Sequence, residues 1–267
     1  MTEEIDPTTP QTTGSQSVPV VQPITIGDIL EVLAQGLRDF RTAPYFGPCV
    51  GGLYTLVGWF LILLLIQFHL PFLVYPLAAG FAFIAPFIAT VCYAVSRSLE
   101  RNEPISFNAV RGAVWNAARR DLGWMALVTG FSLFIWMDMA ALLFFGFLGL
   151  NAMSAPELLQ EIFTTPMGLL FLVIGNGVGA VIAIAVFSFS VISFPMLFER
   201  DTDFVTSMIT SVKVFTTNPA AMLAWCGTIA VLIGLSLLSG LVGLVVVLPV
   251  LGHASWHLYR RAIKQIS

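Results

Sequence analysis

The chain has 267 residues, of which 57% are hydrophobic and only 10% are charged, and its mean hydropathy is +0.89. In soluble domains about a quarter of the residues are charged, so this composition excludes an ordinary soluble fold and indicates a protein of the lipid bilayer. A net charge of -3 leaves no basic surface large enough for nucleic acid, and we expect no nucleic-acid partner.

The chain begins with a polar segment, residues 1–23, rich in Thr, Gln, Ser and Pro. Such a segment cannot bury a core, and it lacks the apolar run of a cleaved signal peptide. We therefore expect residues 1–23 to form a disordered cytoplasmic tail. Residues 24–267 are expected to form a single membrane domain.

Hydrophobic runs follow this tail. Four of them are each long enough to cross a bilayer as one helix, which takes about 20 apolar residues. These runs are residues 47–69, 73–96, 122–150 and 167–198. The last run, 220–259, would be about 60 Å long as one helix, twice the hydrocarbon thickness. We predict that it turns back near Ser239-Gly240, so the expected fold is all-α, with six transmembrane helices arranged as three hairpins.

The cations mark one side of the membrane. All twelve Lys and Arg residues fall in four short stretches, which begin at Arg38, Arg97, Arg200 and Arg260. Basic loops of this kind stay in the cytoplasm, whereas the connection at 151–166 carries no cation. Basic stretches flank the last run on both sides, so both of its ends should lie inside. We expect a multi-pass protein of the bacterial inner membrane with both termini in the cytoplasm.

An amphipathic segment precedes each predicted hairpin. The three segments run from Thr25 to Phe40, from Ser106 to Arg120 and from Asp203 to Thr216. Thr, Ser and Asp are favoured helix N-caps, and the apolar residues that follow recur at the spacing of helices in the membrane interface. In the first segment these apolar residues are Ile26, Ile29, Leu30, Leu33 and Leu37.

The second helix of each hairpin contains a proline, namely Pro86, Pro195 or Pro249. Together with the three amphipathic segments, these prolines indicate a threefold pseudo-repeat with units 24–101, 104–200 and 203–267. Inside a helix each proline removes a backbone hydrogen bond and bends the helix axis. Such a bend either improves the packing of the helices or acts as a hinge in a transport cycle.

Asp138 is the carboxylate that lies deep in a predicted span, about midway along 122–150. An acidic group there costs about 2.5–3.5 kcal/mol, so it needs a partner or water, or stays protonated. Asp138 is therefore a candidate proton- or ion-binding residue. The alternative is a structural role, with a neutral acid hydrogen-bonded to a neighbouring helix.

His253 and His257 lie one helical turn apart near the inner end of the last helix. This spacing can hold a metal ion or one edge of a haem site, but their own helix offers no carboxylate or thiol to complete the ligands. Histidines beside Trp256 and Tyr259 also serve as interfacial anchors or form interhelical hydrogen bonds. We predict no cofactor, and haem or metal binding remains an alternative.

Several segments resemble a known family. The residues that carry the resemblance are Pro86, Tyr93, Ser96, Arg97, Pro195, Asn218, Pro219 and the stretch Gly252-His253-Ala254-Ser255-Trp256-His257-Leu258-Tyr259-Arg260. They resemble a bacterial family of predicted integral membrane proteins of unknown function, some of whose members are labelled putative cytochrome c oxidase. The family has no established catalytic residues, so the resemblance assigns none. A catalytic haem-copper subunit also needs more histidine ligands than the three of this chain.

The function that these observations favour is a non-catalytic accessory or assembly subunit of a membrane complex, with the respiratory complex that the oxidase label suggests as one candidate. The first alternative is a transporter or channel for a small solute or ion that uses Asp138. The second is a haem- or metal-binding membrane protein that uses His253 and His257. The expected partners are the lipid bilayer and other membrane proteins, and no enzyme activity is expected.

Overall fold

A computed structural model describes residues 19–68, 74–149 and 155–264. Within these ranges the secondary structure is helical apart from one isolated β-bridge, so the predicted all-α class is confirmed for them. The helices are α1 (Ile26–Thr42), α2 (Phe46–Gln67), α3 (Val74–Glu100), α4 (Phe107–Arg119), α5 (Leu122–Leu148), α6 (Ala155–Thr164), α7 (Pro166–Ser190), α8 (Ser193–Glu199), α9 (Phe204–Thr217), α10 (Pro219–Leu238) and α11 (Leu244–Ala262).

Four helical segments among the described residues are long and apolar enough to cross a membrane. They are α2, α5, α7 together with α8, and α10. Helices α3 and α11, at the positions of the second and sixth predicted spans, are not among these four. Helix α11 contacts α1, α2, α3, α8 and α10 and buries more than half of its residues. Because protein surrounds much of it, α11 can carry polar residues that a lipid-facing helix could not.

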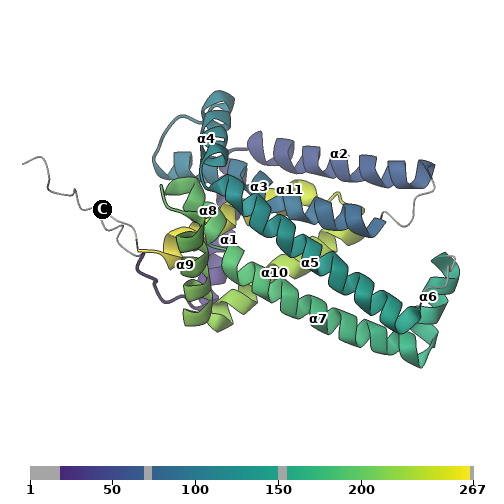
Figure 1. Ribbon diagram of the computed structural model, residues 1–267. Helices are drawn as coiled ribbons and strands as arrows, with labels where there is room; N and C mark the ends of the chain where they lie inside the picture. The colour runs from purple at the N-terminus through teal and green to yellow at the C-terminus, as the bar shows by residue number, and fades with distance from the viewer. Residues whose placement is uncertain (1–18, 69–73, 150–154, 265–267) are drawn as a thin grey trace, which may run out of the picture.

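The helices diverge from one end of the molecule. There α1, α4, α8 and α9 gather, and α2, α5 and α7 extend away from them (Figure 1). We call this the basic end, because Arg97, Arg120, Arg200 and Arg260 lie in it. At the opposite end α6 packs on the start of α7, within the connection 151–166.

The three predicted amphipathic segments form α1, α4 and α9. Each begins at the predicted N-cap, which the structure confirms: the side chains of Thr25, Ser106 and Asp203 accept hydrogen bonds from backbone N–H groups three residues later. These bonds pair amides that the first helical turn leaves free.

The face that α1 turns to the protein differs from its predicted apolar stripe. Ile26 and Leu30 belong to that stripe and are exposed. The residues that α1 buries are Ile29, Val32, Gly36 and Asp39. Close approach of α1 to α11 at Gly36 decides this face, so a small residue and a carboxylate are buried in place of two larger apolar side chains.

The predicted fourth span, 167–198, is divided into two helices. Helix α7 ends at Ser190 and α8 begins at Ser193, with Pro195 in the first turn of α8, where a proline fits without loss of a hydrogen bond. At the break, Ser211 of α9 accepts a hydrogen bond from the N–H of Ile192 (3.1 Å) and donates one to the carbonyl of Ser188 (2.7 Å). The interruption is therefore supported by a neighbouring helix. Pro86 and Pro249 lie inside α3 and α11.

The predicted turn near Ser239-Gly240 is present between α10 and α11. Gly240 and Leu241 both adopt positive φ angles, 68° and 72°. Helix α2 holds this turn, because Trp59 Nε1 donates to the carbonyl of Gly240 (2.7 Å) and Thr55 Oγ1 to that of Leu241 (3.2 Å).

The predicted boundary of the N-terminal tail at residue 23 needs correction. Residues 1–18 lie outside the described residues, but the segment that follows pairs with the end of α11. The N–H of Gln22 donates to the carbonyl of Ala262 (2.8 Å), and the N–H of Lys264 donates to that of Val20 (2.9 Å). Val21 and Ile263 form the β-bridge between these bonds, so residues 19–23 belong to the folded part.

Candidate functional site

Four polar side chains meet at the contact of α1, α3 and α11. Ser96 Oγ lies 2.7 Å from Oδ2 of Asp39 and 2.7 Å from Nδ1 of His253. Nε2 of His257 lies 2.7 Å from the same Asp39 oxygen. Ser96 and His253 are fully buried, and Asp39 is 9% exposed. The two candidate histidines are thus brought together with Ser96, which the sequence marked only as part of the family resemblance, and Asp39 completes the cluster.

Two glycines let the helices approach closely enough to form this cluster. A Cβ on Gly36 of α1 would lie 2.7 Å from the backbone N of Ala254 and from the carbonyl oxygen of Val250 in α11. A Cβ on Gly252 of α11 would lie 2.8 Å from Cβ of Cys92 in α3. Any larger residue at either site would push the helices apart and lengthen the hydrogen bonds beside it.

The hydrogen bonds in the cluster define its proton positions. Burial raises the pKa of the Asp39 carboxyl, but hydrogen bonds from His257 and Ser96 more than offset this, so the pKa lies below its ordinary value. The charged carboxylate accepts the single hydroxyl proton of Ser96. Ser96 then accepts a bond from Nδ1–H of His253, while His257 donates from Nε2. The outer nitrogen of His253, Nε2, is buried without a hydrogen-bond partner among the described residues.

The cluster offers little to a metal ion. Nδ1 of His253 bonds to Ser96 and Nε2 of His257 bonds to Asp39, so the nitrogens do not converge on a common point. Within the described parts of the chain, no group of three or more His, Cys, Asp or Glu side chains is arranged to hold a metal ion. The arrangement also differs from a nucleophilic triad, because the serine lies between the carboxylate and a histidine and is closed to solvent.

A network of charged groups lies next to this cluster at the basic end. The hydroxyl of Tyr259 donates to Glu199 (2.6 Å) and accepts from Nε of Arg200 (2.9 Å). Arg260 bonds to the carboxylates of Glu100 (2.7 Å) and Glu199 (3.0 Å). Arg260 therefore joins the ends of α3 and α8 to α11.

The remaining residues of the predicted motif also hold elements together. Trp256 is fully buried, and its Nε1 donates to Glu100 (3.2 Å). Oδ1 of Asn218 accepts from the N–H of Ile24 (2.7 Å), and Nδ2 donates to the carbonyl of Gln22 (3.2 Å). Asn218 thus fixes the segment before α1, while Pro219 starts α10.

Arg97 lies in the same region and forms no ion pair with a carboxylate of the described residues. Its guanidinium lies over the ring of Phe198, 4.8 Å from the ring centre. Its Nε is buried and has no hydrogen-bond partner among the residues that the structure describes.

Asp138 lies far from the cluster, midway along α5, and is exposed. No hydrogen bond or ion pair of its carboxylate is formed with the described residues. The structure therefore does not bring Asp138 and the two histidines into one site.

Comparison with known proteins agrees with this membrane architecture. Residues 74–199, slightly less than half of the chain, match a family described as "Predicted integral membrane protein (DUF2189)". The chain is an integral membrane protein. No curated protein and no solved structure gives a match. The matched part of this membrane protein runs from α3 to α8 and so includes Ser96 and Arg97, but not Asp39 or the two histidines.

Asp39 was missed by the sequence reasoning, although a signal was present. It falls three residues after Gly36 and ten after Ile29, which places it on the same side of a helix. A carboxylate in line with a small residue and an apolar residue indicates a buried polar partner. Its partners could not be inferred locally, because Ser96 and His257 lie 57 and 218 residues further along the chain.

Proposed function

We propose that this membrane protein is a non-catalytic accessory or assembly subunit, which packs against another membrane protein through the exposed face of α5. The observation that carries the proposal is the exposed position of Asp138 on that face. A carboxylate in contact with hydrocarbon is costly by about 2.5–3.5 kcal/mol, and a hydrogen-bond donor from a partner would remove much of this cost.

The geometry of α5 turns Asp138 away from its own protein. On the other side of the helix, a Cβ on Gly179 of α7 would lie 2.7 Å from the ring of Trp136, so this ring faces α7. Asp138 follows Trp136 by two residues, which is a rotation of about 200° around the helix axis. Asp138 therefore lies on the opposite side of α5.

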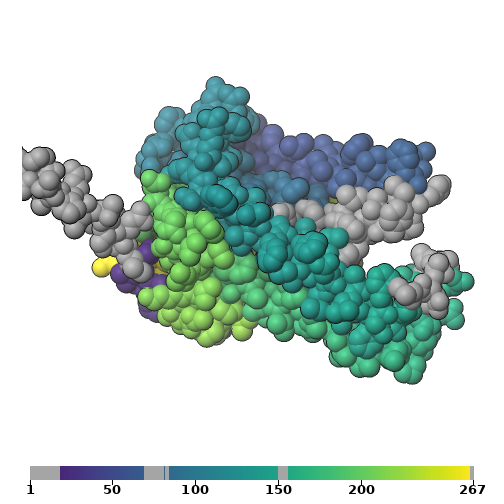
Figure 2. All heavy atoms as spheres, viewed as in Figure 1, coloured from purple at the N-terminus to yellow at the C-terminus, as the bar shows by residue number. Residues whose placement is uncertain are grey.

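Large apolar side chains share the side of α5 that carries Asp138. We call these residues the α5 outer face: Leu127, Phe131, Phe134, Asp138, Leu142 and Phe145. Each is exposed, and successive members are three or four residues apart. This is the spacing by which helices pack along a seam. Only 6% of the most apolar window of α5 is buried, and Figure 2 shows α5 uncovered over much of its length on the face toward the viewer.

The proposal includes the topology of six spans in three hairpins, with both termini in the cytoplasm of a bacterial cell and a threefold pseudo-repeat (24–101, 104–200, 203–267). Its support is the gathering of the cation-bearing segments at the basic end and the pairing of Val21 with Ile263, which brings the two ends of the described chain together. The central position of α11 accounts for its lower hydropathy as a sixth span.

The resemblance to proteins labelled putative cytochrome c oxidase makes subunits of a respiratory oxidase the first partners to test. The transporter alternative has less support, because the large cavity of the protein is apolar and Asp138 does not line it. The haem alternative has less support as well, because His253 and His257 each have a nitrogen bonded within the cluster.

A photo-crosslinking amino acid tests the proposal in cells. Placed at Phe134 of the α5 outer face, it should give an adduct with another membrane protein. Placed at Val231 of α10, which is equally exposed at 61%, it should react mainly with lipid. Asp138→Leu should reduce the Phe134 adduct at least fivefold while leaving the purified protein folded, since leucine is favourable in hydrocarbon.

Three outcomes would count against parts of the proposal. Equal protein adducts at both positions would remove the special role of α5. An adduct formed only with a second copy of the chain would replace the accessory-subunit function by self-association. An adduct with a membrane protein unrelated to respiration would keep the subunit function but reject the oxidase as its partner.

A further inference from the structure

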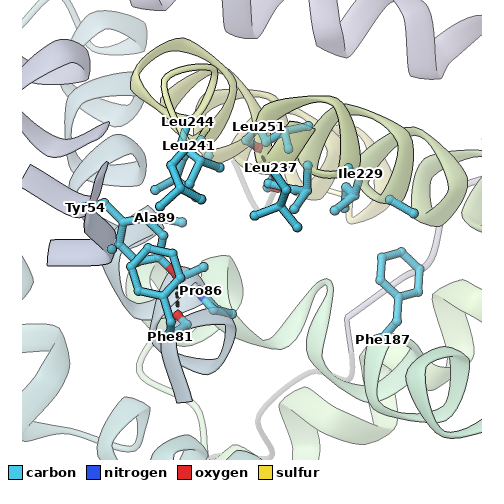
Figure 3. Close-up of a pocket in the computed structure, with 18 of the residues that line it drawn as sticks. Tyr54, Phe81, Pro86, Ala89, Phe187, Ile229, Leu237, Leu241, Leu244 and Leu251 are labelled. Atoms are coloured by element: carbon cyan, nitrogen blue, oxygen red, sulfur yellow. Dashed lines mark hydrogen bonds between the residues drawn. The ribbon is translucent and has the colours of Figure 1, made fainter. Parts of the chain in front are cut away.

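A cavity of about 770 Å³ lies between the helices of the membrane region. Helices α2 and α3 form one wall, α7 and α10 another, and α11 closes it; Figure 3 shows side chains from these helices around the open space. The volume is in the range of pockets that hold small organic ligands. None of its described lining residues comes from α5, so the cavity is separate from the α5 outer face.

The cavity is apolar along most of its length, with polar side chains at the basic end and Tyr54, whose hydroxyl donates to the carbonyl of Phe81, away from that end. Its described lining contains no charged residue. The polar lining residues at the basic end are Tyr93, Ser190, Trp225 and Ser255, which lie in the turns of α3, α7, α10 and α11 nearest that end. From Ser255 to Leu244, at the other end of the α11 wall, the helix rises about 16 Å.

At the polar end two hydrogen-bond donors have no partner among the described residues. The Tyr93 side chain is only 3% exposed, and its hydroxyl forms no hydrogen bond with them. The Trp225 ring forms part of the wall and its Nε1–H is also unpaired, but this atom is enclosed by protein and does not face the open space. By contrast, the hydroxyls of Ser190 and Ser255 donate to carbonyls of their own helices. Polar groups inside proteins are rarely left unpaired, so the Tyr93 hydroxyl is the donor at the polar end that a bound hydrogen-bond acceptor would satisfy.

The Tyr93 ring is held in place rather than free to turn elsewhere. It packs between the rings of Phe198 (6.0 Å between centres) and Trp256 (6.3 Å). Side chains on a helix lean toward its N-terminus, which for α3 means away from the basic end and toward the cavity. Because Tyr93 also lines the cavity, we infer that its hydroxyl lies at the polar end within reach of a bound group.

We propose that this cavity binds an uncharged, lipid-soluble molecule with a carbonyl head group. Its apolar body would lie along Leu237, Leu241 and Leu244, and its carbonyl oxygen would accept a hydrogen bond from Tyr93. The absence of cations from the described lining disfavours a phosphate head group, which arginine or lysine would normally bind. Either a quinone with an isoprenoid tail or the ester of a neutral glycerolipid has this chemistry.

Two glycines of α10 provide a matched test of the cavity. Gly234 lines it and Gly227 does not, and a Cβ at either position would meet no atom within 4 Å. Gly234→Leu should fill the cavity, whereas Gly227→Leu should project elsewhere, and leucine favours a helix at both sites. Binding of decylubiquinone, dioleoylglycerol and dioleoylphosphatidylglycerol to the detergent-purified full chain would be measured by native mass spectrometry.

The expected result is binding of decylubiquinone or dioleoylglycerol that falls at least tenfold in Gly234→Leu and is unchanged in Gly227→Leu. Tyr93→Phe should weaken it roughly five- to tenfold through loss of one hydrogen bond, while Tyr45→Phe, at a side chain 75% exposed, should have no effect. Tighter binding of decylubiquinone or of dioleoylglycerol would show whether the site binds a quinone carbonyl or an ester carbonyl. Failure of both to bind, tighter binding of dioleoylphosphatidylglycerol, or unchanged binding in Gly234→Leu would each overturn the proposal.

Discussion

Oδ2 of Asp39 is the atom that joins three helices of this protein. It accepts hydrogen bonds from Ser96 of α3 and His257 of α11, and Ser96 extends the contact to His253. Removing the charge would leave buried donors unsatisfied, which generally costs more than the net contribution of the bonds themselves. We therefore interpret the histidine pair as part of a contact that fixes α1 on the bundle.

Acid should weaken this contact. The pKa of Asp39 is lower in the folded protein than its ordinary value, so its contribution to stability is present at neutral pH and is lost as pH falls below about 5. Asp39→Asn should be less stable than the wild type at pH 7 and lose less stability on acidification, measured by thermal unfolding in detergent. Some acid dependence should remain, because hydrogen bonds to Thr25 and Thr206 also lower the pKa values of Asp28 and Asp203. Equal acid dependence in the variant and the wild type would contradict this role.

At the scale of the elements, helix ends were predicted better than helix faces. Thr25, Ser106 and Asp203 could be identified as caps because capping depends on residues within one turn. The buried face of α1 could not, because it depends on how closely the backbone of α11 approaches Gly36. The break between α7 and α8 also depends on another element, since Ser211 of α9 satisfies the backbone there.

Two glycines, Gly36 of α1 and Gly112 of α4, should respond in opposite directions to replacement by alanine. Gly36→Ala would place Cβ against backbone atoms of α11 and should destabilise the protein by about 1–3 kcal/mol. A Cβ on Gly112 of α4 would meet no atom within 4 Å, so Gly112→Ala should stabilise by about 0.5–1 kcal/mol through its higher helix propensity. Unfolding of both variants by denaturant in detergent measures the difference. A neutral Gly36→Ala would show that α1 can shift without loss.

At the scale of the whole molecule, the basic end is the densely packed part and the helices diverge from it (Figure 1). The largest fully buried side chains there include Trp225, Trp256, Tyr259 and Phe198. The most apolar windows of α5 and of Pro166–Glu199 bury almost nothing. Packing at the basic end therefore positions the spans, while their outer faces remain available to lipid or to a partner.

The proposed topology predicts which positions are accessible from outside the cell. In a chain whose three cysteines are replaced, a single cysteine at Ser239 should react with a membrane-impermeant maleimide added to intact cells. A cysteine at Asn102, between α3 and α4, should react only after the membrane is opened. Labelling of Asn102→Cys in intact cells, or protection of Ser239→Cys, would reject the arrangement with both termini inside.

The sequence by itself determined the membrane class, the N-caps of α1, α4 and α9 and the turn between α10 and α11, because apolar length, capping and turn formation depend on neighbouring residues. It also marked Asp138 and the histidines as candidates, but it did not predict their surroundings. Only the tertiary structure placed Asp39 between Ser96 and His257, turned Asp138 outward and left a cavity beside Tyr93. These features depend on contacts between helices that are far apart in the chain. The spacing of apolar residues within one helix does not indicate which other helices it contacts.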